Sequence, residues 1–194
     1  MITDSLINRL DHCLREKCPY IYSYYQDPLP DLEIDRYMQK MSIVSEDYKK
    51  LYQWKNGLDF QVSETFPKEF WIHFYGNFLS LKDAWIGWEE NTDEEFWKRS
   101  QIEIMDNLIG EKLFFESDPS SDQYSFIYRF SPSIMPMSEP ITIYDSLGSM
   151  LETIITIYEN DGIKLGDDGL LETDFDLVSR ISAAINVKSE DWKD

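Results

Sequence analysis

The stretch that decides the fold is residues 141–158, ITIYDSLGSMLETIITIY. Its first four side chains are β-branched or aromatic, which is typical of a strand. Ser146 follows as a helix N-cap, because its side-chain oxygen can accept a hydrogen bond from a free amide of the first turn. Apolar residues then return at intervals of three and four, as on one face of an α-helix. The stretch predicts a strand followed directly by a buried helix, whose apolar face is Leu147, Met150, Leu151, Ile154, Ile155 and Tyr158.

Further strands are predicted upstream of this stretch. Residues 113–115 and 124–130 are aromatic and β-branched runs that lie between clusters of Pro, Ser and Asp. No helix-length segment separates these runs, so neighbouring strands are expected to pair antiparallel. Downstream, residues 163–171 predict a hairpin and Phe175–Ile185 a last helix. The C-terminal half therefore predicts an antiparallel sheet with helices beside it.

The N-terminal half is predicted to be mostly helical. Helices are expected over residues 6–14 and 34–41, and from an N-cap at Ser45 to the glycine of Asn56-Gly57, which ends the helix because glycine readily takes the left-handed C′ conformation. Short strand pieces are expected over residues 70–74 and 78–81, then a helix capped by Ser80 and a further acidic helical turn over 91–97. With no internal repeat or low-complexity linker, we expect a single α+β domain over residues 1–194.

The charge of the chain excludes two classes of partner. Its 18 basic and 37 acidic residues give a net charge of −19, and affinity for nucleic acid or for an anionic membrane surface depends on Lys and Arg. The charge is also uneven: the net is −2 over residues 1–60, −9 over 61–144 and −8 over 145–194. Such a field attracts basic protein surfaces. The plainer interpretation, that the acids only keep the protein in solution, stays open.

Catalytic and metal-binding motifs are missing from the sequence. The chain has two histidines and no H-E-x-x-H, C-x-x-C, G-x-S-x-G or glycine-rich phosphate loop. We therefore expect no catalytic residue, no metal and no cofactor, and we interpret His73 as a hydrogen-bonded structural histidine. A carboxylate-based hydrolase remains a remote alternative because 37 acids can form a pair by chance. The N-terminus has no secretory pattern, and Cys13 and Cys18 form neither a C-x-x-C redox motif nor a metal knuckle, so a cytoplasmic location is expected.

Residues 85–97 hold the densest mixture of acidic and aromatic side chains in the sequence, which suggests a binding surface. Aromatic side chains anchor protein interfaces and carboxylates pair with Arg and Lys, so we expect this segment to bind a basic protein. The alternative is an ordinary amphipathic helix whose tryptophans pack on the sheet and whose acids face water. The candidate partner-binding residues are Trp85, Trp88, Glu89, Glu90, Asp93, Glu94, Glu95 and Trp97.

Several short motifs, in order, resemble one protein family. Residues 48–57, YKKLYQWKNG, resemble an L-Y-x-W-x-N-G segment, and residues 78–84, FLSLKDA, resemble F-x-S-L-x-E-A. Residues 158–175 resemble a Y-x-x-G-x-x-x-x-D-G-x-L-x-x-D-F tail, and residues 185–192 an I-x-x-x-N-P-x-S-x-x-W ending with Val187 in place of proline. Over about residues 30–192 the chain thus resembles the SUKH superfamily of Smi/Knr-like cell-wall regulators and bacterial toxin-immunity proteins.

The resemblance implies a curved antiparallel sheet flanked by helices, no catalysis, and function by binding another protein. It implies either an immunity protein that blocks the active site of a cognate toxin or a regulatory interaction module; the oligomeric state is left open. Residues 1–29 would be a helical and Tyr/Pro-rich lead-in, and the segment between Trp85 and Glu111 a long acidic insert. Motif residues with a mainly structural role would be Leu51, Trp54, Asn56, Gly57, Ser80, Leu81, Asp168, Gly169, Asp174 and Phe175.

Overall fold

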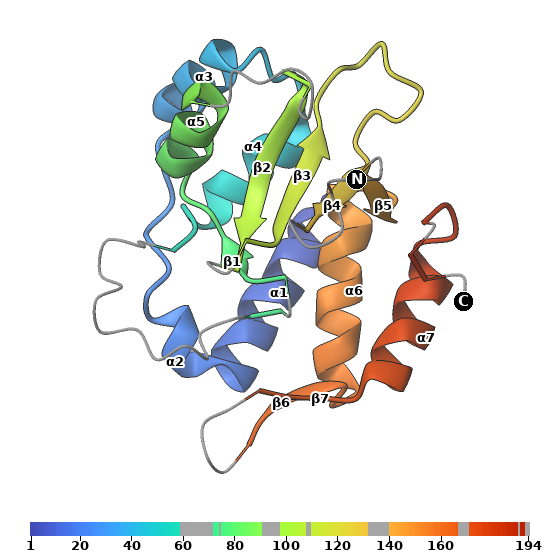
Figure 1. Ribbon diagram of the computed structural model, residues 1–194. Helices are drawn as coiled ribbons and strands as arrows, with labels where there is room; N and C mark the ends of the chain where they lie inside the picture. Colours follow the sequence, from blue (N-terminus) through green and yellow to red (C-terminus); the bar gives the residue numbers. More distant parts are fainter. Residues whose placement is uncertain are drawn as a thin grey trace.

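An open five-stranded antiparallel sheet organises the computed structural model, with helices packed around it and a two-stranded hairpin at one end (Figure 1). This confirms the α+β class predicted from the sequence. The structure describes residues 1–58, 72–73, 75–90, 98–107, 110–131, 140–166, 171–189 and 191–192. Within those residues, no helix is both long and apolar enough to cross a membrane.

In the described part of the chain, four helices come first, and the strands then follow in three groups that are separated by one helix each and closed by a last helix. The helices are α1 (Asp4–Lys17), α2 (Pro19–Tyr22), α3 (Asp31–Lys40), α4 (Glu46–Trp54), α5 (Leu81–Glu90), α6 (Leu147–Glu159) and α7 (Phe175–Ile185). The strands are β1 (Asn77–Phe78), β2 (Gln101–Asp106), β3 (Lys112–Glu116), β4 (Ile127–Phe130), β5 (Ile141–Tyr144), β6 (Ile163–Leu165) and β7 (Leu171–Thr173).

The sheet has the order β1-β2-β3-β4-β5, and each strand pairs antiparallel with the next in the chain. Ile102 of β2 lies opposite Phe115 of β3, and Glu103 lies opposite Phe114, so these two pairs occupy opposite faces. The register shifts between Glu103 and Met105 and again in β4. Such bulges bend strands and increase their twist.

The core lies between one face of the sheet and a layer of helices. Figure 1 shows α4 behind β2 and β3, where the Tyr48 ring stacks on Phe115 with centroids 5.7 Å apart. The central helix of the layer is α6, which packs against α1 and α7. Its N-terminus carries a capping box between Ser146 and Ser149. The helix predicted from residues 141–158 is therefore the helix on which α1 and α7 pack.

Strand β2 is the main element that the sequence analysis missed. The segment between Trp85 and Glu111, expected only as an acidic insert, contains the second strand of the sheet. The signal was present, since Ile102 and Ile104 alternate with polar residues at the period of a strand. The strand predicted over 124–130 is also shorter, because residues 121–125 form turns and Ser125 takes a φ of 69°.

Gly57 has a different role from the one predicted. Helix α4 ends at Trp54 and Lys55 is already extended, so Gly57 is not the C′ residue. Its φ is 67°, and a Cβ at this position would lie 2.2 Å from the carbonyl oxygen of Leu79. Glycine is required here because two backbone segments meet and leave no room for a side chain.

The strand piece predicted over 78–81 is shorter and earlier, since β1 is Asn77–Phe78 and Leu81 already begins α5, but several other predicted boundaries agree with the structure. Ser45 and Ser80 accept hydrogen bonds from the amides of Tyr48 and Asp83 at 3.2 and 3.1 Å, as N-caps do. The last helix has the predicted limits. The acidic turn predicted over 91–97, the pair Asp168-Gly169 and much of the strand piece predicted over 70–74 lie outside the described residues.

Candidate partner-binding surface

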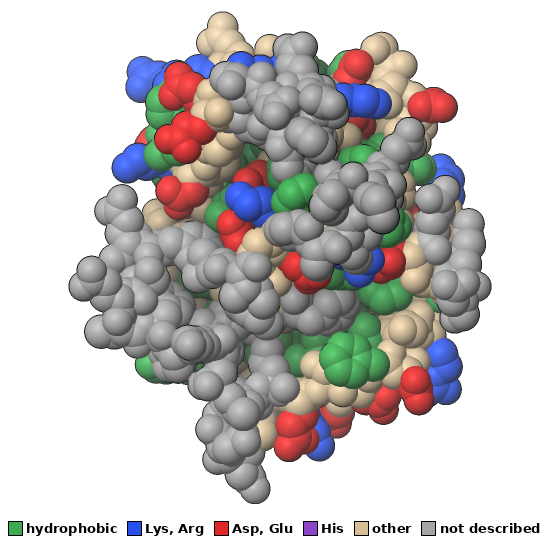
Figure 2. Space-filling view, in the orientation of Figure 1, with side chains coloured by type: hydrophobic (Ala, Val, Ile, Leu, Met, Phe, Trp, Pro, Cys, Tyr) green, Lys and Arg blue, Asp and Glu red, His purple; other side chains and the backbone are tan. Residues whose placement is uncertain are grey.

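Helix α5 holds the part of the predicted binding segment that the structure describes. Leu81 and Ala84 are buried, and the helix packs against β2 on one side and α3 on the other. Trp85 and Trp88 are half-buried, one turn apart on the same helix face. Asp93, Glu94, Glu95 and Trp97 lie outside the described residues. In Figure 2, hydrophobic, acidic and basic side chains mix over α3 and α5 at the upper left.

Trp85 pairs with α3 through an aromatic contact and a cation. Its ring lies 5.8 Å from the Tyr37 ring. The Lys40 ammonium lies 4.0 Å from the Trp85 centroid and 5.3 Å from that of Tyr37. Because Lys40 is exposed, this cation–π contact contributes only about 0.5–1 kcal/mol, whereas a desolvated one contributes about 2 kcal/mol.

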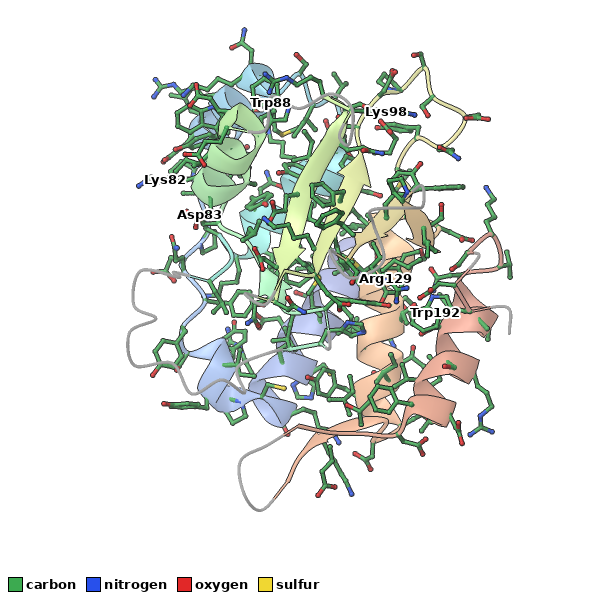
Figure 3. The ribbon with its side chains drawn as sticks, viewed as in Figure 1. Lys82, Asp83, Trp88, Lys98, Arg129 and Trp192 are labelled. Carbon is green, nitrogen blue, oxygen red and sulfur yellow. The ribbon has the colours of Figure 1, made fainter. Side chains whose placement is uncertain are left out.

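Trp88 contacts Arg99 through hydrogen bonds as well as through its ring, unlike Trp85 and Lys40, which share only the ring contact. The Trp88 indole Nε1–H donates to the Arg99 carbonyl at 2.9 Å, and Arg99 Nη1 donates to the Trp88 carbonyl at 2.5 Å. The guanidinium also lies 4.4 Å from the centre of the Trp88 ring. Figure 3 places Trp88 at the end of α5 and Lys98 at the approach to β2. The pair therefore fastens the end of α5 to the segment that leads into β2.

Glu89 and Glu90 are placed where a helix does not favour acids. Both are exposed and lie in the last turn of α5, which contains no basic residue. The C-terminal end of a helix is the negative end of its dipole, so each carboxylate there costs about 0.3–1 kcal/mol. Neither forms an ion pair with any residue that the structure describes. Their local effect on folding is unfavourable, while their position suits contact with an external cation.

A buried carboxylate lies beneath this helix on β2. Glu103 is 8% exposed, and its two oxygens accept from Lys112 Nζ at 2.9 and 2.8 Å. Burial raises the pKa of Glu103 to about 7, because the loss of hydration outweighs the attraction of the lysine. Burial alone would lower the pKa of Lys112, but Glu103 and Asp106 keep it raised. The sequence analysis did not single out either residue of this pair.

Glu103 and Asp106 are also the facing acids that the hydrolase alternative requires. They share Lys112, whose Nζ lies 2.8 Å from Glu103 and 3.4 Å from Asp106. The adjacent pocket offers about 20 Å³, room for about one water molecule. The lysine and the small space favour a structural ion pair over a sugar-binding site. The pocket is lined by Gly87, Trp88, Lys98, Arg99, Gln101, Glu103 and Phe114.

The described family-motif residues mostly hold the fold together. Leu51 and Leu81 are buried. The Trp54 indole donates to Asp11 at 2.8 Å, and Asn56 bridges two segments near the start of α5. Asp174 caps α7 by accepting from the Leu177 amide at 3.0 Å. Phe175 differs from the others because it is 68% exposed and lies outside the core.

The predicted structural histidine is confirmed. His73 is fully buried, its Nε2 lies 3.3 Å from the Tyr144 hydroxyl, and burial lowers its pKa to about 3. Nearby, Arg129 forms an ion pair with Asp191 at 3.1 Å, which fixes the C-terminal segment beside β4. Arg129 and Trp192 appear close together in Figure 3, and the Trp192 indole donates to the Ile143 carbonyl at 2.7 Å. These contacts are structural and lie apart from α5.

Comparison with known proteins gives this chain no assignment: no family model matches it, and no curated protein matches it. The SUKH resemblance and the roles that it implies stay predictions. The candidate surface therefore rests on its own geometry, which combines half-buried tryptophans with exposed acids on one helix.

Proposed function

We propose that this chain is a non-catalytic protein-binding domain that acts as an immunity protein, neutralising a basic cognate toxin by covering its active site. The observation that carries the proposal is the end of α5. There Glu89 and Glu90 are kept at an electrostatic cost, beside two half-buried tryptophans and without a cationic partner among the described residues. A basic partner would compensate these charges on binding.

The two kinds of residue would contribute at different stages of binding. The acidic field of the chain, net −19, accelerates the encounter with a basic surface. Exposed rim charges act mainly on the association rate and its salt dependence, whereas buried aromatic anchors act mainly on the dissociation rate. In this mechanism the acids of α5 align the toxin, and the aromatic side chains of α3 and α5 then hold it.

A protection assay with matched charge variants tests the proposal. The protein is expressed together with the toxin encoded beside its gene, and growth is measured. Glu89→Gln/Glu90→Gln should weaken protection and lower the association rate several-fold at low salt. Glu16→Gln/Asp176→Asn is the control, because it removes two exposed acids from α1 and α7. Equal effects of the two double variants would show that total charge, not α5, matters.

Two outcomes would overturn the immunity role. One is the absence of protection against any adjacent toxin together with failure to bind a basic protein. The other is capture of a partner encoded elsewhere in the genome, which would support the regulatory module instead. Binding that is unchanged from low salt to about 0.5 M would contradict steering by charge, since the Debye length falls to a few ångströms over that range.

A further inference from the structure

The two tryptophans of α5 differ in how their cations are held. Arg99 and Trp88 are joined by two hydrogen bonds, each from the side chain of one residue to the backbone carbonyl of the other, in addition to the ring contact. The Lys40 ammonium lies over Trp85 and Tyr37 but forms no hydrogen bond or ion pair with any residue in the described part of the chain. The Trp88 ring is therefore covered by a guanidinium that hydrogen bonds hold in place, whereas the Trp85 ring is covered by an ammonium that the described residues hold only through ring contacts.

A carboxylate from each of the two helices acts on the Tyr37 ring. Burial raises the pKa of Tyr37, and the charges of Glu33 on α3 and Asp83 on α5 raise it further. The carboxylates of Glu33 and Asp83 therefore act on the Tyr37 ring, which Lys40 also contacts. Figure 3 shows Lys82 and Asp83 together on the outer side of α5. The Lys40 ammonium thus lies over two aromatic rings, and two carboxylates act on one of these rings, a combination that suits a cationic side chain.

We propose that Tyr37 and Trp85 form a subsite for one lysine or arginine side chain of a basic protein partner, and that Lys40 occupies this subsite in the free protein. The proposal rests on the proposed function, because it names where the basic partner is held. On binding, the partner's cation replaces Lys40, whose ammonium moves into water. Trp88 stays closed by Arg99 and takes no cation from the partner.

Exchange is favourable because the two cations meet different environments. Lys40 contacts the rings while exposed to water, where a cation–π contact is weakest. A partner's side chain reaches the same rings beneath an interface that excludes water, where the contact is stronger. Lys40 is therefore a weak competitor, and removing its charge should raise the affinity of the subsite for an external cation.

The test uses a capped tetra-arginine peptide as the probe and the tryptophan indole N–H signals as the readout. The protein is labelled with ¹⁵N-tryptophan, and Trp85→Phe and Trp88→Phe assign the two relevant signals. Titration should shift the Trp85 signal and leave the Trp88 signal nearly unchanged. Lys40→Gln should tighten peptide binding by about two- to five-fold, the contribution of one exposed cation–π contact.

Lys82→Gln is the matched control. It removes the same charge from an exposed position on α5, where no described ring contact to Lys82 exists. The excess of the Lys40→Gln effect over the Lys82→Gln effect measures direct competition, since both variants change the overall charge equally. Equal effects, or a Trp85 signal that does not move, would overturn the subsite. A thermal melt of each variant verifies that it is folded.

Failure of the subsite can be separated from failure of the proposed function. If the cognate protein binds and Glu89→Gln/Glu90→Gln weakens it, but Trp85→Phe and Lys40→Gln leave its affinity unchanged, the function stands and the subsite is wrong. If the peptide shifts Trp85 as expected but no basic protein is bound, the subsite is a cation site and the immunity role is wrong.

Discussion

Replacing Asn56 should show how strongly the start of α5 is anchored. The Asn56 side chain donates from Nδ2 to Gln26 Oε1 at 2.8 Å and accepts at Oδ1 from the Leu81 amide at 3.0 Å. It is 7% exposed. The Leu81 amide is one of the first amides of α5, which have no acceptor within the helix. Asn56 therefore connects the segment after α2, the end of α4 and the beginning of α5.

The expected loss for Asn56→Ala follows from these two bonds. The alanine leaves the Leu81 amide buried without its acceptor, which costs about 1–3 kcal/mol, and removes the Gln26 bond, which contributes about 1 kcal/mol. We expect the free energy of unfolding to fall by about 2–4 kcal/mol. In a domain of this size such a loss lowers Tm by about 4–16 °C.

Urea unfolding at pH 7, followed by tryptophan fluorescence and far-UV circular dichroism, measures this loss. Asn56→Asp keeps an oxygen for the Leu81 amide and adds a negative charge at a helix N-terminus, which is favourable. At pH 7, however, it loses the Gln26 bond and also buries a carboxylate. The matched variant is therefore Gln26→Ala, which removes only the Gln26 bond and should lose about 1 kcal/mol. An Asn56→Ala loss below about 0.5 kcal/mol, or a Gln26→Ala variant as unstable as Asn56→Ala, would refute the anchoring role of the Leu81 bond.

Three further predictions concern Glu103, Gly57 and Gly87. Folding raises the pKa of Glu103 to about 7, so the folded state holds this proton more tightly than the unfolded chain does. The free energy of unfolding of the wild type should therefore fall relative to that of Glu103→Gln as the pH rises from about 4.5 to 7. Urea midpoints at each pH measure this difference. Gly57→Ala should lower the free energy of unfolding by at least about 2 kcal/mol, because φ is positive and the new Cβ would lie 2.2 Å from the Leu79 carbonyl oxygen. An unchanged urea midpoint would contradict the packing described. Gly87→Ala should instead stabilise α5 by up to about 1 kcal/mol, because its Cβ meets the Glu103 carboxylate at an ordinary 3.4 Å; a lower midpoint would show that the helix cannot accept it.

The candidate binding segment was partly visible in the sequence. Trp85, Trp88, Glu89 and Glu90 were predicted to act together, and the structure places them on one helix. It also shows what no pattern indicated, namely that each tryptophan already carries a cation from elsewhere in the chain. Lys40 is 45 positions before Trp85, so only the packing of α3 on α5 brings the two together.

The sequence by itself determined the elements whose causes are local. Ser45, Ser80 and Ser146 start helices because each side chain reaches an amide three residues away, and the apolar spacing of 147–158 depends only on the helical turn. The tertiary structure alone decided that Gly57 is a packing glycine and that Glu103 is a buried, lysine-paired acid. Burial, close approach and charge pairing depend on which distant segments become neighbours, and that is set only when the sheet and helices assemble.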